Sequence, residues 1–330
     1  MSSKLVLKNT STSFNSDVYS KKQDYRNLIA GFTSSFISRT IVAPLDRLKV
    51  IYQVNYQGSK NKPPKVFNGL EEIYKKEGVR GFFRGNLINV IKGSPEVGIR
   101  MYLFEKIKWR YLCYHKEKPS NTFLLFSGAF SGVVANAVIF PLEVLKVRIV
   151  TTDKHLCVGI INTMKKISHE PGGFINFYSG FEASLASAIP NAGISLYCYE
   201  KIKIIVSGKA SVDNANYLST SMIIFVGGLS AIISSTILYP FQTVQARMIM
   251  HNLKHSEFAK EIKDNNINTK SYIQKSKFFS SIYWIMKIEG ITGFYKGYSP
   301  AVLKLSIGNG TGFGIYEKVK QILGVNKTSK

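Results

Sequence analysis

The sequence predicts an all-α membrane protein with six transmembrane helices, built from three tandem repeats. The first observation is a segment organised around a proline that recurs at Pro44, Pro141 and Pro240, 97 and then 99 residues apart. The second is that each proline closes an apolar stretch of helical length, as in residues 123–141 and 222–240. A proline inside such a stretch removes a backbone hydrogen bond and kinks the helix. A period of about 100 residues is too long for a solenoid unit and indicates small units in series.

Composition and charge support this prediction and argue against a soluble nucleic-acid-binding protein. Of the 330 residues, 45% are hydrophobic, although Lys and Arg outnumber Asp and Glu by 44 to 20. This combination is typical of membrane helices separated by basic loops, whereas basicity without apolar stretches would favour nucleic acid as a partner. The cysteines, Cys113, Cys157 and Cys198, are scattered and odd in number. They predict neither a disulfide framework nor a metal site.

The first repeat is predicted over residues 25–115. Before it, residues 1–24 are rich in Ser, Lys and Asn and lack apolar periodicity, which predicts a disordered segment. Whether this segment is removed by processing stays open. The repeat is expected to contain a helix over 27–54, a short amphipathic surface helix over 66–76 and a second long helix over about 85–110.

The second and third repeats, residues 120–208 and 217–325, are expected to follow the same order. Helices are predicted over 121–150, 158–168, 180–205, 219–250 and 297–322. The third repeat is longer, since 57 residues separate Pro240 from Gly297, against 41 and 39 for the corresponding intervals. The excess, residues 251–275, is rich in Lys, Asn and His and is expected to be an irregular, solvated insertion.

Two further elements follow each proline in the same order. An acid leads to an aromatic residue, a base and a glycine, from Glu77 to Phe83-Arg84-Gly85 and from Glu289 to Tyr295-Lys296-Gly297; the middle copy, from Glu170 to Tyr178-Ser179-Gly180, lacks the base. About twenty residues later come an aromatic residue, an acid and a lysine, at Phe104-Glu105 with Lys108, Tyr199-Glu200 with Lys203, and Tyr316-Glu317 with Lys320.

Three elements repeated three times in register resemble the mitochondrial carrier family (solute carrier family 25) over residues 25–325. The resemblance implies six tilted helices with pseudo-threefold symmetry and short surface helices on the matrix side. It also implies a multi-pass protein of the mitochondrial inner membrane with both termini toward the intermembrane space. Such a carrier alternates between a gate on the cytosolic side and a gate on the matrix side. The 251–275 insertion would be a loop on the matrix side.

The resemblance implies a complete cytosolic gate, because the acid of one repeat pairs with the base of the next in this family. The pairs implied are Glu105–Lys203, Glu200–Lys320 and Glu317–Lys108. These charges would lie at equivalent depth, and an ionisable residue in a membrane helix normally faces a cavity or a partner.

The matrix gate is predicted to be incomplete. The same rule gives an intact pair, Asp46–Lys146, but it places Glu143 opposite Gln245 and Lys49 opposite Gln242, so that two of the three links join a charge to an amide. Gln53 matches the glutamine that braces a salt bridge from below in this family, and the other repeats have apolar residues there.

Residues that bind an asymmetric solute should differ between repeats, whereas gates and kinks should repeat. Lys92, Glu96 and Arg100 share one stripe of a helix at i, i+4 and i+8. The second repeat has Ser187, Asn191 and Ser195 at these positions, and the third has Lys304, Gly308 and Gly312. The sequence thus predicts a set of unpaired cavity cations that are not present in all three repeats, namely Arg39, Lys92, Arg100 and Lys304.

Several bases against the single acid Glu96 predict a polyanionic substrate that carries phosphate. Arg39, Lys92 and Lys304 fall where adenine nucleotide carriers hold their phosphate-binding bases. The sequence around them resembles ATP-Mg/phosphate carriers most closely, in residues 43–50, 89–96 and 189–194, and coenzyme A carriers share much of it. Ser187-Ala188 stand where these carriers recognise adenine with a glycine and an aliphatic residue.

The resemblance implies a second ligand, cardiolipin, which this family binds at helix starts of this kind. A base and free backbone N–H groups at a helix N-terminus form an anion site, at Arg84-Gly85 and Lys296-Gly297, with a weaker site at Gly180. No nucleophile, acid–base pair, metal or cofactor motif stands out, so we expect a monomeric transporter and not an enzyme. Two alternatives remain open, a coenzyme A carrier and a carrier fold that serves as a proton or anion leak.

Overall fold

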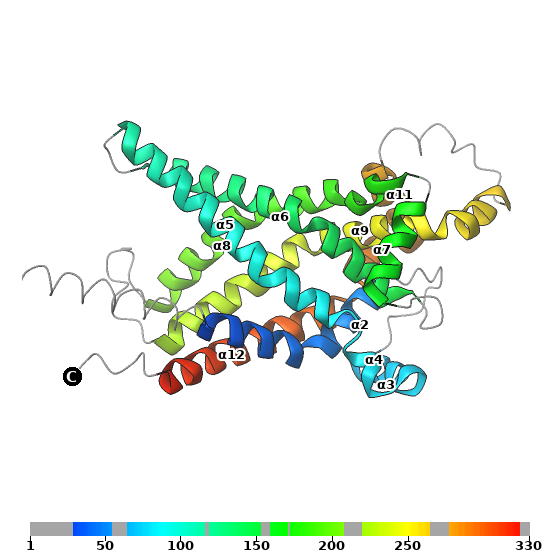
Figure 1. Cartoon of the computed structure of the whole chain (residues 1–330), viewed down its shortest axis with the longest axis horizontal. Coiled ribbons are helices and arrows are strands. Elements are labelled where there is room, and N and C mark those ends of the chain that lie inside the picture. Colours follow the sequence, from blue (N-terminus) through cyan, green and yellow to red (C-terminus); the bar gives the residue numbers. More distant parts are fainter. Residues whose placement is uncertain are drawn as a thin grey trace, which may run out of the picture.

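The computed structural model describes residues 29–54, 65–115, 119–152, 159–170, 172–207, 220–264 and 277–323, and within them all regular structure is helical. The long helices run along the longest axis of the molecule (Figure 1). They are the helix over residues 29–41, which continues into α2 (Ala43–Val54), and α5 (Asn86–His115), α6 (Asn121–Thr151), α8 (Phe181–Ser207), α9 (Thr220–Asp264) and α12 (Tyr298–Ile322).

Short helices precede the second long helix of each repeat and gather at one end of the molecule, on the right in Figure 1. They are α3 (Val66–Glu77) and α4 (Val79–Phe82) in the first repeat, α7 (Gly159–His169) and the 3₁₀ helix η1 (Gly173–Tyr178) in the second, and α11 (Lys277–Glu289) and the 3₁₀ helix η3 (Ile291–Tyr295) in the third. The helices α3 and α7 lie within one residue of the surface helices expected at 66–76 and 158–168. The third repeat supplies its own surface helix, α11.

The prolines lie where the sequence places a kink. In the first repeat the helix gives way to a turn at Val42, and α2 begins at Ala43, directly before Pro44. Pro141 and Pro240 lie inside α6 and α9. We call the end of the molecule beyond these residues the proline end. The residues 1–24, for which we expect disorder, lie outside the described residues.

One expectation about the third repeat was wrong. The stretch 251–275 was expected to be irregular, but α9 continues without interruption through Asp264. Residues 251–264 contain no Gly or Pro to end the helix. The remainder of the stretch lies outside the described residues.

Three glycines begin the second long helix of each repeat in the left-handed conformation. Gly85, Gly180 and Gly297 have φ of 81°, 85° and 82° directly before α5, α8 and α12. A Cβ at Gly180 would lie 2.9 Å from the Gln245 carbonyl oxygen, and one at Gly297 would lie 2.8 Å from the Lys49 carbonyl oxygen. Only glycine combines this conformation with so close an approach of a neighbouring helix.

The buried core lies at the proline end. Its main cluster is formed by apolar residues next to and beyond the prolines and by residues of α5, α7 and η1: Val50, Val54, Ile88, Phe140, Val144, Leu145, Val147, Val150, Ile167, Phe177, Ala246, Ile249 and Met250. The outer surface is apolar as well, since the repeat-equivalent residues Ile41, Val138 and Ile237 are each about half exposed. A large exposed apolar surface of this kind indicates contact with a membrane.

By length and composition, two of the described helices are apolar enough to cross a membrane, over Thr122–Thr151 and Phe225–Met250. Other long helices carry charges on one stripe, such as Lys92, Glu96 and Arg100 of α5. Charged residues on one side lower the mean hydropathy of a helix without exposing charge to lipid, provided that side faces the interior.

Polar side chains join each long helix to the next around a closed ring. In order from the first helix, the contacts are Arg39–Asn89, Lys92–Glu143, Asn136–Ser184, Asn191–Ser234, Thr236–Tyr298 and Thr311–Ser38. The last contact returns to the helix over 29–41, so one chain closes the ring by itself.

Candidate functional site

A cavity of about 370 Å³ lies inside the ring of helices and extends past the prolines into the proline end. This volume is in the range of small-molecule sites. Every long helix contributes to its lining, which consists of Arg39, Asp46, Lys49, Val50, Gln53, Asn89, Lys92, Glu96, Asn136, Ile139, Glu143, Lys146, Val147, Ser184, Ser187, Gln242, Gln245, Ala246, Ile249 and Lys304. Of the residues predicted to bind substrate, Arg39, Lys92, Glu96, Ser187 and Lys304 are in this lining, whereas Arg100, Ala188 and Asn191 are not.

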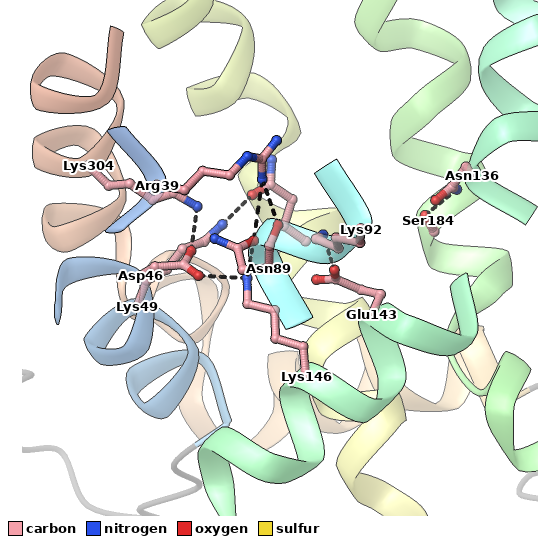
Figure 2. A network of polar contacts seen from close by, with 11 residues as sticks. Arg39, Asp46, Lys49, Asn89, Lys92, Asn136, Glu143, Lys146, Ser184 and Lys304 are labelled. Carbon is pink, nitrogen blue, oxygen red and sulfur yellow. Dashed lines mark hydrogen bonds and ion pairs between the residues drawn. The ribbon is translucent and has the colours of Figure 1, made fainter. Parts of the chain in front are cut away.

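Lys92 and Lys304 are each paired with an acid, which corrects the expectation that these two cavity lysines are unpaired. Lys92 forms an ion pair with Glu143, and Lys304 forms one with Asp46 (Figure 2). The physical reason is that an isolated charge is costly away from water, so ammonium and carboxylate groups within reach of each other pair. A substrate anion that binds these lysines therefore competes with Glu143 and Asp46.

Arg39 is held against α5 by polar contacts. Its Nη1 donates to the backbone carbonyl of Asn89 at 3.2 Å and to the side-chain Oδ1 of Asn89 at 3.5 Å. Its Nε donates to Ser35 Oγ at 3.2 Å. Figure 2 shows the guanidinium directed toward Asn89 on the same side of the cavity as Lys304. Arg39 thus lines the cavity without a carboxylate partner in the described part of the chain.

At the proline end, one expected pair and one expected amide link are in place. Lys146 Nζ lies 2.6 Å from Asp46 Oδ2, and both side chains are about 6% exposed. Lys49 Nζ donates to Gln242 Oε1 at 3.0 Å and lies over the Tyr239 ring, 5.7 Å from its centroid. Gln53, expected as a brace, is buried, and its backbone carbonyl accepts from Arg247 Nε at 2.9 Å.

The third link differs from the expectation. Glu143 contacts Lys92 and not Gln245, although Gln245 lines the same cavity. An ammonium group offers a carboxylate a charge-assisted bond that a neutral amide cannot match. A base of the cavity therefore replaces the base that the third repeat lacks.

The helix ends lie apart at the other end of the bundle, the open end, on the left in Figure 1. Among the described residues, two of the pairs predicted for the cytosolic gate, Glu105–Lys203 and Glu317–Lys108, are not formed. Lys108 pairs with Glu105 of its own helix at 4.0 Å, with the two side chains 38% and 63% exposed. Lys203 and Lys320 lie over the rings of Tyr199 and Tyr316 in their own helices. The side chain of Glu200 lies outside the described residues. Exposed charges on separated helix ends gain little from pairing across the gap.

The bases expected at the cardiolipin sites are engaged inside the protein. Arg84 Nη1 lies 3.4 Å from Glu77 Oε1, and Lys296 Nζ lies 2.9 Å from Glu289 Oε1; each base is 13% exposed. These bases therefore each neutralise an acid of the protein, and the cardiolipin sites stay a prediction. The helix starts at Gly85, Gly180 and Gly297 remain as described above.

Three buried arginines, for which no role was predicted from the sequence, hold Glu77, Glu170 and Glu289. Arg47, Arg148 and Arg247 are at most 9% exposed, and each bonds the acid that starts the second element of its repeat: Glu77 at 2.5 Å, Glu170 at 2.5 Å and Glu289 at 2.7 Å. A signal was present for two of them, because Arg148 and Arg247 each follow their proline by seven residues. Arg47 follows Pro44 by three, and this difference in spacing conceals the equivalence.

Comparison with known proteins identifies the family. The family model described as "Mitochondrial carrier protein" matches residues 20–115, 117–210 and 217–327. The chain is 32% identical over 316 residues to "Mitochondrial adenyl nucleotide antiporter SLC25A24" of Mus musculus, covering 94% of this chain and 61% of that protein. It is 32% identical over 301 residues to "Calcium-binding mitochondrial carrier protein SCaMC-2-A" of Danio rerio, covering 91% and 60%.

A further relative is "Mitochondrial substrate carrier family protein C" of Dictyostelium discoideum, 29% identical over 303 residues that cover 92% of this chain and 59% of that protein. The chain thus spans about three-fifths of the length of these curated relatives. The three matched segments coincide with the three proline-centred repeats and together span most of the sequence. The chain therefore belongs to the mitochondrial carrier protein family, a family of membrane transporters.

Proposed function

We propose that this protein is a mitochondrial inner-membrane carrier that exchanges phosphate-bearing anions, namely adenine nucleotides of the ATP-Mg, ADP and phosphate type, by alternating access. The observation that carries the proposal is the charge of the cavity. Its lining holds five bases, Arg39, Lys49, Lys92, Lys146 and Lys304, against the three acids Asp46, Glu96 and Glu143. An excess of positive charge in a narrow, partly desolvated cavity favours a polyanion.

The relatives support the nucleotide part of the proposal, because those from mouse and other vertebrates carry the description "adenyl nucleotide antiporter". Coenzyme A, which also carries phosphates on an adenine nucleotide, is the alternative substrate. Ser187 is the one residue of the expected adenine position that lines the cavity. Its small side chain leaves room for a flat ring in either substrate.

We place the open end of the bundle toward the intermembrane space, together with both termini, and the proline end toward the matrix. The ring of polar contacts closes within one chain, which supports a monomer. For cardiolipin, we propose that the backbone N–H groups at the starts of α5, α8 and α12 bind its phosphates, because the neighbouring bases are engaged by Glu77 and Glu289.

Transport of labelled ADP into proteoliposomes loaded with ATP tests the function. Lys92→Ala and Lys304→Ala should each lower uptake by more than about tenfold, the effect of losing one charge-assisted bond to phosphate. Lys76→Ala, on the exposed face of α3, is the matched control and should transport normally, since its ion pair with Glu72 is solvated. Uptake near the wild-type rate by both cavity variants would show that these lysines do not bind the nucleotide, and a wild-type protein that takes up no ADP would exclude it as substrate. Uptake without any internal counter-substrate would favour a leak.

A further inference from the structure

Asn89 is a neutral residue of the cavity lining, at the level of the closed proline end. It is on α5, one turn before Lys92, and is 3% exposed. Its Oδ1 accepts from Lys146 Nζ at 3.3 Å and from Arg39 Nη1 at 3.5 Å. One amide oxygen thus serves two cations, one from the cavity wall and one from the closed proline end (Figure 2).

Arg39 is held in position by contacts with the backbone of α5. The backbone carbonyl of Asn89 accepts from Arg39 Nη1 at 3.2 Å. One turn further on, a Cβ at Gly93 would lie 2.5 Å from Arg39 Cζ, so the guanidinium packs directly against the backbone of α5 and a larger residue there would displace it. A side chain held in this way loses less conformational freedom when it binds a ligand.

The contacts of Asn89 extend through the closed end. Lys146 also pairs with Asp46, and Asp46 pairs with Lys304. Arg39, Asn89, Lys146, Asp46 and Lys304 therefore form one continuous polar network, which begins and ends with a candidate anion-binding base. Arg39 and Lys146 share the Oδ1 of Asn89 as an acceptor. If Arg39 moves toward a ligand, this oxygen is left to Lys146 alone.

The repeats provide an internal comparison. The positions equivalent to Arg39 and Asn89 are Asn136 and Ser184 in the second repeat, where Asn136 Nδ2 donates to Ser184 Oγ at 2.7 Å. In the third repeat they are Ser235 and Ala301. The contact between the two helices is thus present in two repeats, but it holds a cation only in the first. A contact needed for packing alone has no requirement for that cation.

We propose that Asn89 is a positioning residue: its carbonyl and amide oxygens fix the Arg39 guanidinium for an anionic group of the substrate and couple that group to Lys146 of the closed end. The inference rests on the proposed transport of phosphate-bearing anions. It adds the residue through which binding at Arg39 is communicated to the Asp46–Lys146 pair.

The test measures ADP binding to the purified full-length protein, by the ligand-induced rise in melting temperature over a concentration series, with inorganic phosphate as a second probe. Asn89→Ala should raise the apparent Kd for ADP by about tenfold, because Arg39 loses its side-chain acceptor on α5. In the Arg39→Ala background the same substitution should have little further effect, since Asn89 acts on ADP through Arg39.

Asn89→Asp distinguishes positioning from a packing role. Its carboxylate should hold Arg39 and Lys146 more tightly, so the melting temperature without ligand rises while the Kd for ADP also rises through competition. A residue that only supports packing would lower both stability and affinity. Asn86→Ala is the matched control, because Asn86 Nδ2 bonds Thr40 Oγ1 at 3.2 Å between the same two helices without a cation. It should lower the melting temperature and leave the Kd unchanged.

Each result decides between the two levels of the proposal. If the wild-type protein responds to neither ADP nor phosphate, the proposed function is wrong and this inference with it. If the wild type binds ADP but Asn89→Ala binds it equally well, or loses affinity equally with and without Arg39, the inference alone is wrong. Should Asn89→Ala not fold, Asn89→Ser is used for the same comparison, because the second repeat makes this contact with a serine.

Discussion

Lys92 and Lys304 each have two potential partners, an acid of the proline end and an anion in the cavity. In the described structure the acids Glu143 and Asp46 hold these lysines. A buried ion pair is strongly destabilised when only one partner is removed. A substrate that binds the lysines therefore leaves the two acids uncompensated and weakens the closed end, which links binding to opening through named side chains.

Away from the cavity, the most informative single acid is Glu77, at the end of the surface helix α3. Burial raises the pKa of Glu77, but the hydrogen bond and charge of Arg47, together with Arg84, outweigh it and hold the pKa below its ordinary value. A carboxylate with a lowered pKa contributes stability above its unfolded-state pKa, and the contribution is lost as pH falls through the folded-state value.

We therefore expect Glu77→Gln to destabilise the protein at neutral pH by about 3 kcal/mol, because it leaves Arg47 buried without an acid. The difference in melting temperature between wild type and variant should shrink as the pH falls below about 4.3, the ordinary value for Glu. Thermal unfolding in detergent from pH 3 to pH 8 would measure it. Glu71→Gln, on the same helix in an exposed pair with Lys75, should change little at any pH.

At the scale of elements, the short helices of each repeat are attached to the long helices by an acid that contacts buried bases. The middle repeat has one base fewer than the other two. Glu77 contacts Arg47 and Arg84, and Glu289 contacts Arg247 and Lys296. In the second repeat, Ser179 stands at the position of Arg84 and Lys296 and donates instead to the Met248 carbonyl at 2.9 Å.

Adding the missing base should strengthen this junction. We expect Ser179→Arg to raise the melting temperature, because a second base would neutralise Glu170, which is 17% exposed and contacts Arg148. Ser179→Ala, which removes the Met248 bond without adding a base, should lower it slightly. Differential scanning fluorimetry of both variants would show the difference. An arginine variant no more stable than the alanine variant would mean that the connection from Glu170, two residues longer than in the other repeats, keeps the base out of reach.

Elements were predictable from the sequence where local signals repeat. The prolines, the glycines before α5, α8 and α12, and the apolar runs mark helix starts and kinks, and most helix bounds lie within a few residues of the prediction. The extension of α9 to Asp264 was missed because Lys- and Asn-rich composition resembles that of a loop, although residues 251–264 also contain the good helix formers Leu, Lys, Glu and Ala.

The site was predictable in its residues and not in its pairings. The spacing of the repeats places Lys92, Glu143 and Gln245 near the same level of the bundle. It does not decide whether Glu143 contacts Lys92 or Gln245. That depends on the reach of side chains across three helices and on the cost of leaving a charge unpaired. Asn89 was missed for a related reason, since a neutral amide gives no signal in a survey of charges.

At the scale of the whole molecule, the structure is closed at the proline end and open at the other, so the bonds of the proline end describe one state of the proposed cycle. One of those bonds is weaker than the family pattern, and another uses a base that a substrate can engage. Lys49 is held by the Gln242 amide and the Tyr239 ring, and Glu143 depends on a cavity lysine. The closed state should accordingly be easier to open, and less substrate binding energy is needed to open it.

We therefore expect Gln242→Asp combined with Gln245→Lys to stabilise the closed proline end and to slow exchange. The aspartate would convert the 3.0 Å Lys49 contact into an ion pair, and the lysine would give Glu143 a base that no substrate removes. Each new charge-assisted bond should add roughly 1 kcal/mol or more to the closed state. Melting temperature and ADP/ATP exchange in proteoliposomes measure the two effects.

Double-mutant cycles show whether the effects arise from these pairs. Lys49→Ala should abolish the gain from Gln242→Asp, and Glu143→Ala should abolish the gain from Gln245→Lys, because the coupling energy of each pair disappears with its partner. The lysine at position 92 should meanwhile become freer to bind substrate, so that the double variant binds ADP more tightly although it transports more slowly. Faster exchange with no rise in melting temperature would show that Gln242 and Gln245 do not face Lys49 and Glu143 in the closed state, and the assignment of the ring would have to be abandoned.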